Sequence, residues 1–87
     1  MLEEMIGQKI VIDLRSEYVC LGTLAAVGDH FLEMTNVDLH DLRDTETTRE
    51  NYIVAAVFTG IQRNRRRILL NRSEVVAVAL LADVVDE

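Results

Sequence analysis

Four arginines stand within five residues, and this is the densest group of one chemical type in the chain: Arg63, Arg65, Arg66 and Arg67. Guanidinium groups fork onto the oxygens of phosphates and carboxylates. A run of this kind at the entrance of a strand can therefore bind nucleic-acid phosphates. A solvated loop, or a segment that meets the carboxylates of a neighbouring subunit, would use the same residues, and we favour these structural interpretations.

The charge is unevenly distributed along the sequence. Residues 1–46 carry ten acids and three bases, residues 47–72 carry one acid and six arginines, and residues 73–87 carry four acids and no base. The formal net charge of −6 argues against general nucleic-acid binding, because lysine and arginine supply most of the non-specific affinity. Acidic surfaces that meet the arginines of a neighbouring subunit explain the segregation as well as RNA does.

Carboxylates and one imidazole are concentrated between residues 38 and 46, at Asp38, His40, Asp41, Asp44 and Glu46. This spacing lacks the glycine of an EF-hand turn, and one histidine among carboxylates is not a zinc ligand set. We therefore expect a solvated acidic loop and no metal.

The remaining reactive side chains favour packing over chemistry. Cys20 has no histidine partner in the sequence pattern and is expected to be a buried thiol, and His30 is expected in a turn. Phe31, Tyr52 and Tyr18 could stack on bases, but we interpret them as core or interface residues. No Ser-His-Asp ordering, phosphate-cradling glycine loop or His-Glu-x-x-His motif is present, so we expect neither an enzyme nor a cofactor.

These side chains belong to one small domain, because 87 residues leave no room for a second. The chain is 49% hydrophobic but only 5% aromatic, which favours a sheet core of valine, leucine, isoleucine and alanine. One cysteine and an acidic N-terminus without an apolar segment predict a cytoplasmic protein. Its apolar runs are far shorter than the roughly 20 residues of a membrane span, so no membrane contact is expected.

The pattern predicts three strands joined by short turns. Apolar residues of one parity, Ile10, Ile12 and Leu14, indicate a half-buried strand over residues 8–14. A second strand over Tyr18–Val27 contains Gly22, where a strand bends or another backbone passes close. A third covers Phe31–Leu39, with apolar and polar residues alternating from Leu32 onward, and is followed by a polar loop. Together the three form an antiparallel meander.

The rest of the chain provides two more strands and two segments that could be helical. Arg65–Asn71 and residues 74–81 form a tight strand pair, which is followed by an acidic tail over residues 82–87. Residues 2–6 are a brief helix or a fraying end. Five short, bent strands describe a small barrel, which removes the exposed edges of an open sheet.

Residues 47–60 are ambiguous between helix and strand. Thr47 and Glu50 have the spacing of a capping box, and Gly60 stands where a helix would end. Residues 52–58 are nevertheless rich in strand formers. We favour the helix, and a strand there would make a six-stranded sheet.

The order of elements resembles the Sm and Sm-like family, including the bacterial Hfq type. The matching segments are residues 7–12, then residues 22–24 and 29–32 for the first Sm motif, and residues 68–78 for the second. The resemblance covers residues 5–42 and 65–81. It implies a mainly β, five-stranded, strongly bent antiparallel barrel with an inserted helix in an enlarged connection over residues 43–64.

The resemblance also implies where RNA would bind. In the family, the turn after the first motif's aspartate carries a base-stacking side chain and then an asparagine that reads a base. Glu33 stands at the asparagine position here, and a carboxylate repels phosphate and only accepts hydrogen bonds, which argues against a uridine pocket. The second motif usually ends in Arg-Gly and here reads Asn71-Arg72. Arg72 can still reach a phosphate or stack on a base, and the Tyr-Lys-His signature of Hfq is absent.

From these observations we expect a single domain over residues 1–87 that works as a homo-oligomeric scaffold or interaction module. Its partners would be further copies of itself, in a ring or another homo-oligomer, or another protein. The alternative is an RNA-binding ring with this binding set: Phe31, Arg63, Arg65, Arg66, Arg67 and Arg72. A small enzyme would need a concave pocket with perturbed titrating groups, which the sequence does not indicate.

Overall fold

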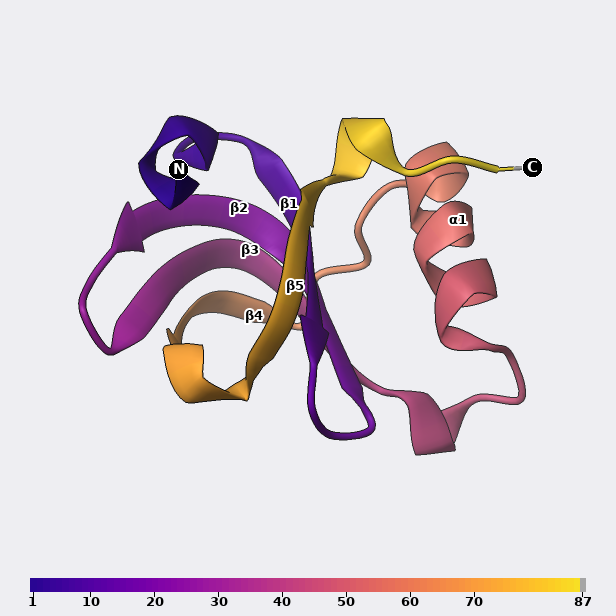
Figure 1. Cartoon of the computed structure of the whole chain (residues 1–87). Helices are drawn as coiled ribbons and strands as arrows, with labels where there is room; N and C mark the ends of the chain where they lie inside the picture. Colours follow the sequence, from indigo (N-terminus) through magenta and orange to yellow (C-terminus); the bar gives the residue numbers. More distant parts are fainter. Residues whose placement is uncertain (87) are drawn as a thin grey trace.

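Five antiparallel strands form one sheet, as the alternating apolar residues predict (Figure 1). The strands are β1 (Lys9–Leu14), β2 (Tyr18–Val27), β3 (Phe31–Asp41), β4 (Arg65–Asn71) and β5 (Val75–Leu80). The computed structural model describes residues 1–86. Glu87, the last residue of the acidic tail expected over residues 82–87, lies outside the described residues.

The strand order in the sheet is β4-β3-β2-β1-β5. The expected pairing of β4 with β5 is wrong, because β4 pairs with β3 and β5 pairs with β1. A short 3-10 helix, η3 (Arg72–Glu74), separates β4 from β5, and the Asn71 side chain caps it by accepting from the Ser73 backbone N–H at 3.0 Å. The strands β4 and β5 are therefore the two edges of the sheet.

The sheet bends at Gly22, where β2 lies close to its neighbour β3. A Cβ atom on Gly22 would lie 3.1 Å from the carbonyl oxygen of Thr35 and 3.2 Å from a methyl carbon of Val37, so the expected close backbone approach at this glycine is confirmed. Opposite it, Asn36 adopts a left-handed backbone with φ of 51°, and the β2–β3 register shifts between Leu21 and Thr23. At this shift, Gly22 of β2 lies opposite two residues of β3, which is a β-bulge. The extra residue of a bulge bends its strand and increases the twist.

The larger core lies on one face of the bent sheet. It consists of Ile10, Ile12, Leu14, Cys20, Leu24, Leu32, Met34, Val37 and Leu70. The N-terminal 3-10 helix η1 (Leu2–Met5) packs Leu2 and Met5 against this core. The brief N-terminal helix is therefore present, and it is not a fraying end.

A second core lies on the other face, beneath the helix α1 (Arg49–Thr59). Ile53 and Ala56 of α1 pack with Val11 and other apolar residues of β1 and β2. The 3-10 helix η4 (Leu81–Asp83) and the segment after it run towards α1 (Figure 1). The strand β1 is consequently buried on both faces, and the half-buried strand expected from its alternation is wrong, since α1 covers Val11.

The helix expected over residues 47–60 is confirmed, and the strand alternative is wrong. The Thr48 hydroxyl caps α1 by accepting from the Asn51 backbone N–H at 3.1 Å. The cap is thus one residue later than the capping box predicts. Glu50 is therefore the second residue of the helix and not the third, which is the position that closes a capping box. Gly60 ends the helix with φ of 86°, a conformation that favours glycine.

The strand β3 continues to Asp41 and is joined to α1 through the 3-10 helix η2 (Leu42–Asp44). The polar loop expected directly after residue 39 therefore starts later. None of the helices in the described part of the chain is long and apolar enough to cross a membrane.

Candidate functional site

The β2–β3 turn and the start of η3 meet at one corner of the molecule, and this corner holds Phe31 and Arg72. The Arg72 backbone N–H donates to the His30 carbonyl oxygen at 2.9 Å, and its guanidinium Nη1 donates to the Gly28 carbonyl oxygen at 2.7 Å. Phe31 pairs with Asn71 across β3 and β4 and remains 48% exposed. The structure thus brings these two predicted site residues together.

The corner offers an exposed ring and a cation. The Arg72 side chain donates to a neutral carbonyl oxygen, so this hydrogen bond orients the guanidinium without neutralising its charge. A phosphate oxygen could accept from its remaining N–H groups, and a base could stack on the Phe31 ring.

Glu33 forms an ion pair across the strands. Its carboxylate accepts from the Arg67 guanidinium at 3.1 Å, and this hydrogen bond lowers the pKa of Glu33. The Glu33 carboxylate is therefore held by β4. Arg67, a predicted phosphate-binding residue, is occupied by the same pair.

The other predicted arginines lie at the start of β4, away from the corner. Arg63 donates to the Asn36 side-chain oxygen at 2.7 Å, and Arg65 donates to the carbonyl oxygen of Asn64 at 3.0 Å. The Arg66 side chain has no hydrogen bond or ion pair with any residue from 1 to 86. Residues 67–71 of β4 stand between Arg66 and Arg72, which corresponds to a separation of roughly 20 Å at strand spacing.

The structure therefore divides the predicted binding set into two. One part is the corner with Phe31 and Arg72, and the other is the arginine segment, residues 63–67. A shallow depression of about 170 Å³ in the arginine segment is lined by four consecutive residues, from Arg63 to Arg66. It is formed by one stretch of chain, whereas the corner combines two turns that are distant in sequence.

A buried polar cluster joins α1 to β3. The Tyr52 hydroxyl donates to the carboxylate of Asp38, which is only 4% exposed. The Asn64 side-chain amide also donates to Asp38, at 3.3 Å. The side-chain oxygen of Asn64 accepts from the Leu39 backbone N–H at 3.1 Å. His40 stacks on Tyr52 with ring centroids 3.9 Å apart. Burial and then the hydrogen bond to Asp38 raise the pKa of Tyr52.

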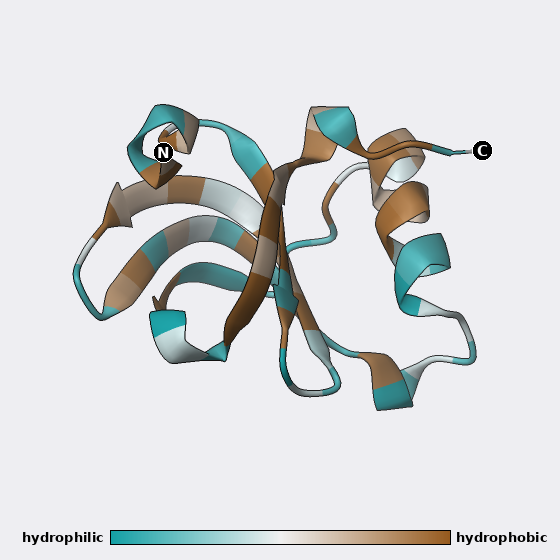
Figure 2. Ribbon diagram, viewed as in Figure 1, coloured by the Kyte–Doolittle hydropathy of each residue, from teal (hydrophilic) through white to brown (hydrophobic). Residues whose placement is uncertain are grey.

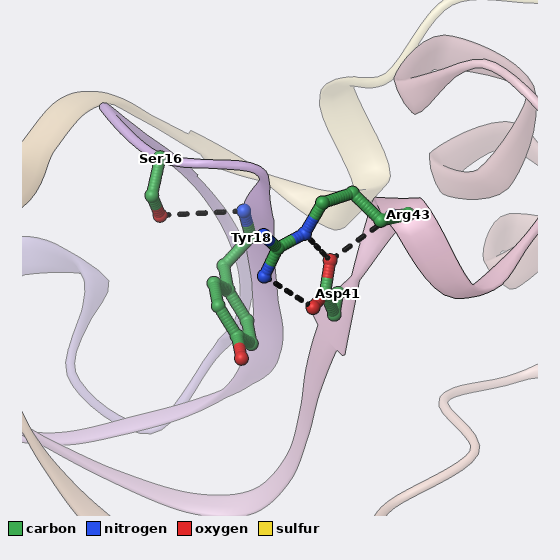
Figure 3. A network of polar contacts seen from close by, with 4 residues as sticks. All are labelled: Ser16, Tyr18, Asp41 and Arg43. Carbon is green, nitrogen blue, oxygen red and sulfur yellow. Dashed lines mark hydrogen bonds and ion pairs between the residues drawn. The ribbon is translucent and has the colours of Figure 1, made fainter.

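The solvated acidic loop expected over residues 38–46 is thus wrong for its first half. Asp38, His40 and Asp41 lie on β3, where the pleat sends Asp38 towards α1. Arg43 forks onto Asp41 at 2.9 and 2.7 Å, as Figure 3 shows, and these bonds lower the pKa of Asp41 to about 2. Among residues 1–86, no three His, Cys, Asp or Glu side chains are grouped so that they could hold a metal ion.

Cys20 is a buried thiol, as expected. It is fully inaccessible on β2 within the larger core. Burial, with a smaller contribution from the charge of Asp38, raises the pKa of the thiol to about 12. A group with so little thiolate at neutral pH is not a nucleophile.

A third surface is formed by the two edges of the sheet, β4 and β5. Leu69 on β4 is 54% exposed and Val76 on β5 is 65% exposed, and both strands lack a partner on one side within the described residues. The sequence of β5, Val-Val-Ala-Val-Ala-Leu, contains no charged residue and thus indicates an apolar edge. Figure 2 shows this apolar strand in the foreground.

Solved structures with similar folds are known, although no protein-family model and no curated protein sequence matches the chain. An Sm-like protein from Archaeoglobus fulgidus superposes with a TM-score of 0.61 at 21% sequence identity, and the match covers 92% of this chain and 88% of that one. A chain in the crystal structure of the NatC complex bound to CoA gives a TM-score of 0.61 at 16% identity, over 92% of this chain and 83% of that one. With its five antiparallel strands, the chain therefore has the mainly β Sm-like fold that the sequence motifs predicted.

Proposed function

We propose that this chain is a self-assembling Sm-like module that acts by binding, as a scaffold or interaction domain, and not by catalysis. The observation that carries the proposal is the pair of open edges, β4 and β5, at opposite ends of the strand order. Each edge presents unpaired backbone N–H and C=O groups, which bind readily to another strand.

The composition of the β5 edge supports the same proposal. Natural proteins protect free edges with charges, proline or a covering segment. The strand β5 contains neither a charged residue nor a proline, and β1 pairs with it on one side only. An apolar edge of this kind is expected to be paired with another chain in the working protein.

The two edges differ in sequence, so a contact between them is head-to-tail. Such contacts build a ring when the rotation between subunits closes, and an open filament when it does not. The likeness to an Sm-like protein supports the ring, as the rings of the family use their exposed edges in this way. The second structure of similar fold is a chain of a protein complex, which agrees with a role in assembly.

A ring that binds RNA is the second candidate, and the corner of Phe31 and Arg72 favours it. The exposed ring and the guanidinium held 2.7 Å from the Gly28 carbonyl oxygen are chemically suited to a single-stranded nucleotide. The Glu33 carboxylate two residues from Phe31 and the net charge of −6 count against it.

Size-exclusion chromatography with light scattering tests both functions. The scaffold proposal expects an oligomer larger than a dimer that leaves a uridine-rich or adenine-rich oligoribonucleotide unbound at low and moderate salt. A salt-sensitive shift of the oligonucleotide that disappears in Phe31→Ala and Arg72→Ala would establish the RNA-binding ring instead. A chain that stays monomeric at high micromolar concentration would overturn both.

A further inference from the structure

An apolar groove lies where the last residues of β5 pass the C-terminal end of α1. It has a volume of about 350 Å³, and its lining consists of Gln8, Lys9, Val57, Leu80, Leu81 and Ala82. Val57 and its neighbour Phe58 are both exposed on α1. Apolar side chains of α1 therefore pack on the sheet and also remain exposed at the C-terminal end of the helix (Figure 2).

We propose that this groove is a docking site for a second copy of the chain, and that the occupant is the arginine segment at the start of β4. This inference rests on the proposed self-assembly and specifies which residues meet. It adds to edge pairing a contact made by α1 and by the residues after β5.

Strand direction brings the two segments together. All four strand pairs within the chain are antiparallel, and antiparallel pairing is also slightly stronger per residue. If β4 of one copy joins the free side of β5 in this sense, its first residues lie beside the last residues of β5. Arg65 and Arg66 of one copy then reach Leu80 and the groove of the next, since Leu80 belongs to both the edge and the groove.

The charges at these two ends are complementary. The start of β4 carries Arg65, Arg66 and Arg67, and Arg66 has no charged partner among residues 1–86. Asp83, at the end of η4, and Asp86 are both exposed and lie within six residues after β5, and residues 73–87 contain no base. An arginine is also suited to the groove itself, because its aliphatic stem can cover Val57 while its guanidinium reaches a carboxylate.

A charge-swap series measured by light scattering tests the docking site. Arg66→Glu and the double substitution Asp83→Arg with Asp86→Arg each place like charges at the contact, so each should raise the dissociation constant of the assembly about fivefold or more. Combining all three substitutions in one chain restores opposite charges and should recover assembly. Val57→Ser should weaken assembly at low and high salt alike, whereas the charge variants should lose their effect as salt rises.

The matched control is Asp44→Arg, which changes charge by the same amount per site at an exposed position on η2. Circular dichroism shows whether each variant is folded. If the wild-type chain assembles but the charge variants behave like Asp44→Arg, or the combined variant is no better than its parents, the docking site is wrong while self-assembly stands. The groove would then be free for another protein. A monomeric wild-type chain would refute the proposed self-assembly together with the docking site.

Discussion

The Tyr52 hydroxyl on α1 donates a hydrogen bond to the Asp38 carboxylate on β3. Asn64, at the entrance to β4, donates to the same carboxylate and is itself fixed by its backbone N–H, which donates to the Val37 carbonyl oxygen at 2.7 Å. One buried acid thus holds both α1 and the end of the connection that leads into β4. The position of α1, and with it the groove wall at Val57, depends on this cluster.

Tyr52→Phe should lower the free energy of unfolding by about 1–3 kcal/mol, because it leaves a buried carboxylate short of a donor. Urea denaturation at pH 7 measures the change. Tyr18→Phe is the matched control, since the Tyr18 hydroxyl has no hydrogen bond with any described residue, and its effect should stay below about 0.5 kcal/mol. Equal effects of the two substitutions would show that Asp38 does not depend on Tyr52.

The acids between residues 38 and 46 show where sequence reasoning stops. Their composition indicates a polar loop, and this is correct from η2 onwards. It fails at Asp38, because the bulge at Asn36 changes which residues of β3 face α1. A bulge depends on how two strands pair, and Tyr52, the residue that satisfies Asp38, is 14 residues away in the sequence.

Gly22→Ala should destabilise the fold by about 1–3 kcal/mol, the usual cost of overpacking. The new methyl group would lie 3.1 Å from the Thr35 carbonyl oxygen, which is backbone and cannot move without disturbing β3. Ala26→Ser, at an exposed position of the same strand, should change stability by less than about 0.5 kcal/mol. Thermal or urea unfolding distinguishes the two, and a neutral Gly22→Ala would mean that β2 and β3 separate easily here.

The strands themselves were predictable because their patterns are local. Gly22 was found from its position alone, and the bounds of β2 and β4 agree with the expected ones. The partners of the strands were not predictable in the same way. Arg72 and Gly28 are 44 residues apart in the sequence, and Arg67 and Glu33 are 34 apart, so nothing in either neighbourhood indicates the contact.

Cys20 should be unreactive towards a thiol reagent such as DTNB at pH 8 in the native protein. The pKa of the thiol is raised to about 12, chiefly by burial, so thiolate is scarce and access is blocked. Labelling should then follow the opening of the fold and become fast in denaturing urea. Introducing an exposed thiol by Ala26→Cys provides the positive control, and rapid native labelling of Cys20 itself would contradict the buried position.

The ion pair between Asp41 and Arg43 should make stability depend on pH in the acid range. Hydrogen bonds from Arg43 lower the pKa of Asp41 from 3.8 to about 2 in the folded protein. A depressed pKa stabilises the folded state above the unfolded value, and this contribution is lost as the pH falls through the folded value. Asp41→Asn keeps an oxygen that can cap η2 but removes the charge.

The difference in unfolding free energy between wild type and Asp41→Asn should therefore be constant from pH 7 to pH 5. It should shrink as the pH falls from 3.8 through about 2, because the Asp41 carboxyl becomes neutral in the folded protein only below that pH. Asp44→Asn is the control, because the Asp44 side chain has no ion pair within residues 1–86 and its difference should stay near zero throughout. A difference for Asp41→Asn that persists unchanged at the lowest pH would assign the stabilisation to the cap of η2 and not to the charge on Asp41, since only the charge is removed by protonation.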